Sequence, residues 1–195
     1  HLGISSELAR QYDRLASRVL YLDESLRAAP AVLARNTLGQ SALWGHGISG
    51  DVPILLVEVQ HVDDLRLVRH VLQAQEYWRL KGLRADVVIL NEHPADYLDQ
   101  VHEGLSSLIA GGSWGAWRDK PGGVFLLRTD GLAAADRGLL TSVARAVLSG
   151  SRGELSEQLD RPSPNPTLPR TLFAQRAVPL ADDGPRAIEP GPLLM

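Results

Sequence analysis

Five polar side chains stand at or just beyond the ends of three apolar segments: Glu58, Asn91, Glu92, Arg128 and Asp130. If those segments are parallel strands, their carboxyl ends share the sheet edge where open α/β proteins bind ligands. One hypothesis is therefore a small α/β enzyme that acts there on a phosphosugar or a glycoside. Strand ends are also polar without any ligand, because they meet water and cap helices. The second interpretation is a polar edge with no chemistry.

A glycine-rich segment at 45–51 resembles two catalytic motifs and completes neither. Its glycines have the spacing of a dinucleotide-binding fingerprint, but that motif follows a strand and opens a helix, whereas this one precedes a strand. A nucleophilic Ser49 paired with His46 would need a glycine where Asp51 stands and a strand leading into the serine. We therefore interpret the segment as a turn held by side-chain hydrogen bonds from Ser49 and Asp51 to backbone amides.

The loop at 111–123 holds two tryptophans, Trp114 and Trp117, among glycines. Flat aromatic faces stack on sugar rings, and a flexible loop can present them, so this loop is a candidate carbohydrate-binding site. Because tryptophan is highly buried on average, the favoured interpretation is that the rings fold back onto the domain or dock on a partner.

The composition excludes several functions. The chain has 195 residues and no cysteine, so disulfides and thiolate metal sites cannot form. Its internal histidines never have the one-turn helical spacing of a zinc site, and we expect neither a metal nor another cofactor. A net charge of −3 with only two lysines argues against nucleic-acid binding. No apolar run approaches the ~20 residues that cross a bilayer, so we expect a soluble chain that does not insert into a membrane.

The elements that must position these residues begin with a long amphipathic helix. Ser5 or Ser6 can cap its start and Pro30 follows its end. Apolar residues recur between them at spacings of four and three, which predicts a single buried stripe. The stripe consists of Leu8, Tyr12, Leu15, Val19, Leu22 and Leu26.

Apolar runs at 54–59, 87–90 and 124–127 each precede a helical pattern, at about 63–80, 96–109 and 134–148. This alternation predicts parallel pairing, and the nearly continuous apolar runs predict a sheet covered on both faces. The fold class is therefore α/β: a small three-layer domain with a short, mainly parallel three-stranded sheet flanked by helices. Its two open edges lead us to expect that adjoining protein covers part of the surface.

Three parts are predicted along the chain. Residues 1–42 form an N-terminal helical segment that packs on the core, and residues 43–160 form the α/β domain. Eight of the twelve prolines lie between Pro162 and Pro192, so residues 161–195 are predicted to be an extended, proline-rich linker arm. The chain looks like a piece of a longer polypeptide.

Several motifs follow one another along residues 8–160. Short ones lie at 14–17, 76–79 and 81–83. Longer ones are Gly39-Gln40-Ser41-Ala42-Leu43-Trp44, Gly47-Ile48-Ser49-Gly50-Asp51, Asp86-Val87-Val88-Ile89-Leu90-Asn91-Glu92 and the segment 122–128. Together, and in this order, the motifs resemble the bacterial cyclic β-1,2-glucan synthases.

The resemblance implies a large enzyme at the inner membrane that builds β-1,2-glucan from UDP-glucose and has a cellobiose-phosphorylase-like region. This stretch looks like a connector in the phosphorylase-like half, on the cytoplasmic face, with neighbouring domains as partners. The catalytic acids belong elsewhere, so no catalytic residue is carried onto this chain. Two alternatives stay open: a carbohydrate-binding module that contacts β-1,2-glucan through Trp114 and Trp117, and part of a soluble β-1,2-oligoglucan phosphorylase.

Overall fold

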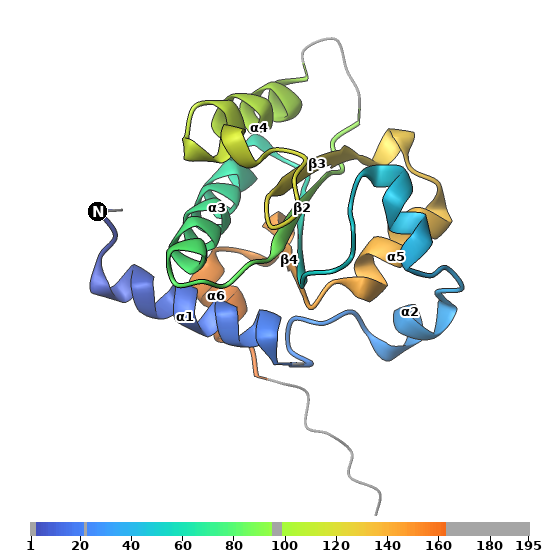
Figure 1. Ribbon diagram of the computed structural model, residues 1–195, viewed down its shortest axis with the longest axis horizontal. Coiled ribbons are helices and arrows are strands. Elements are labelled where there is room, and N and C mark those ends of the chain that lie inside the picture. The colour runs from blue at the N-terminus through green and yellow to red at the C-terminus, as the bar shows by residue number, and fades with distance from the viewer. Residues whose placement is uncertain (1–2, 22, 95–98, 163–195) are drawn as a thin grey trace, which may run out of the picture. The chain divides into compact units, whose positions relative to one another are not determined.

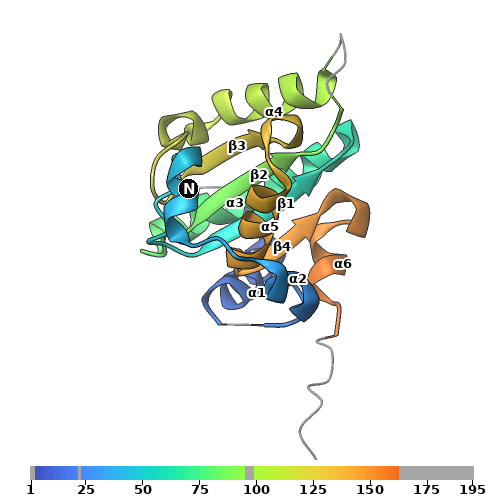
Figure 2. The same cartoon turned by 90° about the vertical axis from the view of Figure 1, so that its right-hand side faces the viewer.

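The computed structural model describes residues 3–21, 23–94 and 99–162. In this part of the chain four parallel strands form one sheet in the order β3-β2-β1-β4, as Figure 2 shows. The prediction of an α/β fold with a parallel sheet flanked by helices is confirmed, and the number of strands is corrected from three to four. The strands are β1 (Ile54–Val59), β2 (Asp86–Asn91), β3 (Val124–Arg128) and β4 (Ala146–Ser149).

Strand β4 lies where the sequence predicts the end of a helix. Helix α5 (Ala134–Val143) ends earlier, and the backbone is no longer helical at Ala144. Val143 and Val147 are four positions apart, as on one face of a helix, so periodicity alone does not distinguish a new strand from a continued helix. All four residues of β4 are buried, whereas an amphipathic helix buries one face. The backbone of β4 pairs with the second edge of β1, next to a 2.8 Å hydrogen bond from Arg145 N to Ile54 O.

One face of the sheet is covered by the crossover helices α3 (Leu65–Leu80) and α4 (Gln100–Ala110), together with α1 (Ser6–Leu20) and α6 (Leu155–Leu159). Figure 1 shows these helices on one side of the strands. Alternate strand residues such as Val57 and Ile89 point into this larger part of the core.

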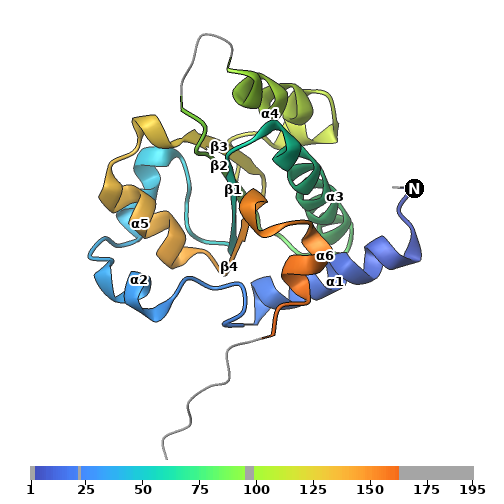
Figure 3. The same ribbon diagram turned by 180° about the vertical axis from the view of Figure 1, so that it is seen from behind.

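The other face is covered by α5 and the 3₁₀ helix η1 (Gln40–His46), and α2 (Pro30–Arg35) packs against α5; Figure 3 shows this side from behind. Both faces of the sheet are therefore apolar and buried, as the continuous apolar runs predict. Short 3₁₀ helices follow three strands: η2 (Val62–Asp64) follows β1, η4 (Thr129–Gly131) follows β3 and η5 (Gly150–Arg152) follows β4. A further one, η3 (Ser113–Trp117), follows α4.

Helix α1 is shorter than predicted but buries the predicted stripe. Ser5 caps it, accepting a 3.2 Å hydrogen bond from Leu8 N. Tyr12 and other stripe residues are fully buried, and Tyr12 O accepts a 2.8 Å hydrogen bond from Trp78 Nε1 on α3. Leu26 is buried beyond the end of the helix, and Leu22 lies outside the described residues. The predicted arm at 161–195 also lies outside them, apart from its first two residues.

The outer edge of β4 is closed by groups from elsewhere in the chain. Leu26 O accepts a 2.7 Å hydrogen bond from Val147 N. Gln158, fully buried on α6, takes the place of a further strand: its Oε1 accepts from Ser149 N at 3.1 Å, and its Nε2 donates to Ser149 O at 2.9 Å and to Gly153 O at 2.7 Å. Open strand edges invite pairing with other chains, and these contacts remove that opportunity.

Replacing Gln158 by alanine should therefore destabilise the fold. The change leaves the buried backbone N–H and C=O of Ser149 without partners, which costs about 1–3 kcal/mol per group. We expect the free energy of unfolding, measured by urea denaturation, to fall by roughly 2–4 kcal/mol. Gln100→Ala, at an exposed position of α4, is the matched control and should change it by less than about 0.5 kcal/mol. Equal effects of the two changes would contradict this role for Gln158.

At the opposite end of the sheet, two buried side chains hold the turn before β3. Asp86 Oδ1 accepts a 2.6 Å hydrogen bond from Gly122 N, while its Oδ2 has no partner. Gln75 Nε2 donates to Ala85 O at 2.9 Å and to Gly123 O at 2.7 Å. Burial raises the pKa of Asp86 from 3.8 to about 6, against the opposing effect of the Gly122 hydrogen bond.

The raised pKa of Asp86 predicts a distinct pH dependence of stability. Between pH 4 and 6 the folded chain binds a proton that the unfolded chain releases, so the free energy of unfolding should fall as the pH rises through this window. The upper limit is about 1.4 kcal/mol per unit of pKa difference. Asp86→Asn stays neutral in both states and should lose this dependence in urea titrations at several pH values. Superimposable pH profiles for the two proteins would contradict the assignment.

Candidate functional site

The five predicted strand-end residues lie at one edge of the sheet but on opposite faces. Asn91 and Arg128 share a register row with Val59, whose side chain points toward α3 and α4. Glu58 shares its row with Leu90, which points toward α5. Glu92 also faces α5, where it pairs with Arg137. The sheet therefore separates the glutamates from Asn91 and Arg128, and the five do not converge on one point.

Arg128 lies between two aspartates, Asp99 at the start of α4 and Asp130 on η4. It pairs with Asp99, which caps α4 by accepting a 3.0 Å hydrogen bond from His102 N, and with Asp130 Oδ2 at 3.0 Å. Hydrogen bonds donated by Arg128 lower the pKa of both carboxyl groups, and the same bonds to Asp130 and Asp99 raise the pKa of the guanidinium. All three groups stay charged near neutral pH, which suits an ion-pair cluster better than a general acid or base.

The other two residues at the end of β2 are also engaged within the protein. Asn91 is 1% exposed, and its Oδ1 accepts a 3.0 Å hydrogen bond from His93 N, while its Nδ2 has no partner. Glu92 accepts a 2.8 Å hydrogen bond from Gln60 Nε2 in addition to its pair with Arg137. Their polar atoms mainly fix the loop after β2 and join it to α5.

The place where doubly wound sheets bind ligands lies between β1 and β4. Here the strand order reverses: the β1–β2 and β2–β3 crossovers pass over one face of the sheet, and the β3–β4 crossover passes over the other. Asp64 occupies this place. Its Oδ2 accepts hydrogen bonds from Gln60 N at 2.8 Å and His61 N at 2.9 Å, and it lies against Gly150 after β4. A Cβ at Gly150 would lie 2.0 Å from Asp64 Cγ, so the switch point is filled by the chain itself.

The tryptophan loop is packed onto the α3–α4 face. Trp114 is half-buried against the core, and a Cβ at Gly112 would lie 2.5 Å from its ring. Trp117 is 36% exposed, and the guanidinium carbon of Arg79 lies 4.2 Å from its ring centroid. The fold-back interpretation describes Trp114 well, whereas Trp117 keeps part of its ring in solvent. Sugar binding by this loop stays a prediction.

The segment at 45–51 forms a tight turn. Gly47 and Gly50 have φ of 73° and 75°, a region that favours glycine. Ser49 Oγ accepts a 3.2 Å hydrogen bond from Asp51 N, as expected for a turn-forming serine. His46 Nε2 lies 3.7 Å from Asp136 Oδ2. His46 therefore lies near a carboxylate of α5, and Ser49 stabilises the turn.

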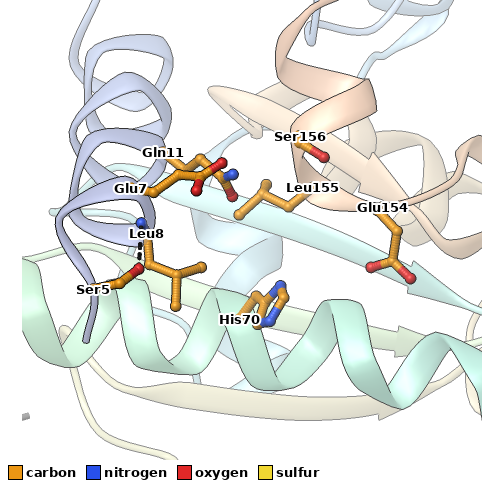
Figure 4. Close-up of a pocket in the computed structure, with 8 residues that line it drawn as sticks. All are labelled: Ser5, Glu7, Leu8, Gln11, His70, Glu154, Leu155 and Ser156. Carbon is orange, nitrogen blue, oxygen red and sulfur yellow. Dashed lines mark hydrogen bonds between the residues drawn. The ribbon is translucent and has the colours of Figure 1, made fainter. Parts of the chain in front are cut away.

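Figure 4 shows a shallow cavity of about 290 Å³ between α1, α3 and α6. Two leucines, Leu8 and Leu155, line it together with His70. Two of its polar residues are engaged at helix ends: Ser5 caps α1, and Glu154 caps α6 and pairs with Arg66 at 3.4 Å. No group of three potential metal ligands occurs in the described part of the chain. Among the same residues, no helix has the length and apolar character to cross a bilayer.

Sequence reasoning missed the side chains that organise both ends of the sheet: Asp64, Asp99, Gln75, Asp86 and Gln158. A helix-cap signal was available for Asp99, because it precedes the amphipathic stretch of α4. The predicted helix start at 96 lies outside the described residues. Buried glutamines such as Gln75 have no such signal, because their partners are backbone groups distant in sequence.

The strand order and the carboxyl ends of the strands define a doubly wound type of α/β domain, and its own side chains fill the switch point. Over 162 residues the chain is 33% identical to the cyclic beta-(1,2)-glucan synthase NdvB of Rhizobium meliloti (strain 1021). This match covers 83% of the chain but only 6% of that protein, so the chain is related to a small part of a glucan synthase. No protein-family model matches it.

The close approach of Gly150 to Asp64 predicts that Gly150→Ala destabilises the protein. The added methyl group has to displace a carboxylate that caps two backbone amides, and overpacking of this kind costs roughly 1–3 kcal/mol. Gly131→Ala is the matched control, because a Cβ there meets nothing within 4 Å. Urea denaturation should show a loss for Gly150→Ala and little change for Gly131→Ala. Indistinguishable curves would mean that Asp64 does not fill the switch point in solution.

Proposed function

We propose that this chain is a non-catalytic structural module of a cyclic β-1,2-glucan synthase that connects and orients neighbouring domains. The similarity to NdvB supports the kind of parent enzyme. We place the parent at the cytoplasmic face of the inner membrane, where it would make the glucan from UDP-glucose. In this proposal the bond-making residues belong to other parts of the polypeptide.

The filled switch point is the observation that carries the non-catalytic role. Ligands of doubly wound sheets enter between the strands at this position, and here Asp64 and Gly150 leave no room. The ion pairs of Arg128 and Glu92 then tie strands to helices at the same edge. An edge organised in this way supplies rigidity and a fixed shape, which a connector requires.

A second candidate is a carbohydrate-binding module that uses the tryptophan loop. The partly exposed ring of Trp117 favours it, because an aromatic face in solvent can stack on a sugar. A parent that is a β-1,2-oligoglucan phosphorylase would retain the same connector role with a different reaction. Neither alternative places bond-making residues on this chain.

An activity assay tests the non-catalytic role. The purified chain is incubated with UDP-glucose, and separately with linear β-1,2-glucan and inorganic phosphate, while membranes containing NdvB serve as the positive control. We expect neither glucosyl transfer nor release of glucose 1-phosphate. Calorimetric titrations with UDP-glucose and phosphate should likewise show no saturable heat. Turnover by the chain that Glu92→Gln or Arg128→Gln abolishes would overturn the proposal.

A further inference from the structure

Trp44, on η1, has the second most exposed aromatic ring among the described residues, after Tyr21, and its position is fixed. Its side chain is 64% exposed, yet its Nε1 donates a 3.3 Å hydrogen bond to Ser49 O. Gln40 Nε2 donates to the same oxygen at 2.8 Å. The only polar atom of the indole is therefore satisfied within the protein, while the flat face of the ring stays in water.

A cavity of about 300 Å³ lies at the amino ends of β1 and β4, and Gln40 and Leu43, on the same 3₁₀ helix as Trp44, help to line it. Trp44 itself is not a lining residue, but its indole is linked to the lining through Ser49 O, which accepts from both Trp44 Nε1 and Gln40 Nε2. Its volume is at the lower end of the ~300–1,000 Å³ typical of small-molecule sites. Its lining includes the apolar residues Leu43, Ile54 and Val143 and three polar residues of different kinds: Gln40, Asp51 and Arg145.

The turn at Gly50 builds this cavity. Gly50 has φ of 75°, and a Cβ there would lie 3.0 Å from both Gln40 Cγ and Leu43 Cδ1. Gln40 Nε2 also lies 3.3 Å from Asp51 Oδ1, which joins two of the polar lining groups. The ring, the amide and the carboxylate are thus held in one arrangement by a single tight turn.

We propose that Trp44 and this cavity form a saccharide-binding site. Sugars present an apolar ring face and a rim of hydroxyl groups, and a fixed aromatic face beside amide, carboxylate and guanidinium groups matches both. That the saccharide is a β-1,2-linked glucan rests on the proposed function. The site lies at the opposite end of the sheet from the filled switch point, and it is separate from the Trp114 and Trp117 loop.

The surroundings of Trp44 favour a saccharide over a protein partner. Protein interfaces need a broad contact area, usually with several apolar residues at its centre. Among the described residues, the other large exposed apolar side chains lie on α1 or at its end and on α3, η2 and η3, whereas Trp44 belongs to η1, on the α5 side of the sheet. A single ring beside a mixed polar cavity suits a small, hydroxyl-rich ligand.

Isothermal titration calorimetry of the chain with a linear β-1,2-glucan oligosaccharide of about five residues tests this site. We expect saturable binding that Trp44→Ala weakens at least tenfold and Asp51→Ala weakens several-fold. Tyr21→Ala, which removes an exposed aromatic ring at the end of α1, is the matched control and should change the affinity less than twofold. Trp117→Ala tests the alternative site in the 111–123 loop. Circular dichroism and urea denaturation of each variant establish that its fold is retained.

Each outcome decides the proposal. Absence of binding to the unaltered chain overturns the site and leaves the non-catalytic role, which the turnover assay tests separately. Binding that Trp117→Ala removes and Trp44→Ala leaves intact also overturns it, and assigns carbohydrate binding to the 111–123 loop. Equal binding of a cello-oligosaccharide supports a saccharide site but assigns it no preference for the β-1,2 linkage.

Discussion

The covered sheet imposes the constraint on which the rest of this structure depends. Helices on both faces exclude water, so the backbone groups at the ends and edges of the strands must find most of their partners among the chain's own atoms. Gln158 completes the ladder of β4, and Asp64 caps the backbone after β1. Gln75 and Asp86 perform the same task at the amino ends. Side chains that could contact a ligand are thereby committed to structure.

Much of the core could be predicted because its signals are local. Continuous apolar runs gave three strands, and the spacing of Tyr12, Leu15 and Val19 gave the buried face of α1. Strand β4 could not be separated from α5, since Val143 and Val147 also fit a helical period. Its existence depends on the free edge of β1, a feature of the tertiary structure that periodicity does not contain.

The candidate site was predicted in its position but not in its arrangement. Because the carboxyl ends of parallel strands lie at the same end of a sheet, the sequence predicted Glu58, Asn91 and Arg128 to lie there, and in the structure they do. Their division between two faces follows from the register, which depends on how the strands align and cannot be obtained from each strand alone. Asp64 was missed because its role depends on Gly150, 86 positions further along the chain and adjacent only after folding.

A filled edge and an open aromatic site are consistent within one module. The charged groups at the carboxyl edge stabilise the fold by pairing with one another, so a ligand there would have to displace those pairs. At Trp44 a ligand displaces only water, because the indole N–H is already bonded to Ser49 and the turn at Gly50 fixes the geometry. Binding therefore requires little reorganisation of the protein, which reduces its entropic cost. In the proposed role, the module would hold a flexible polymer in this way while chemistry takes place in another domain.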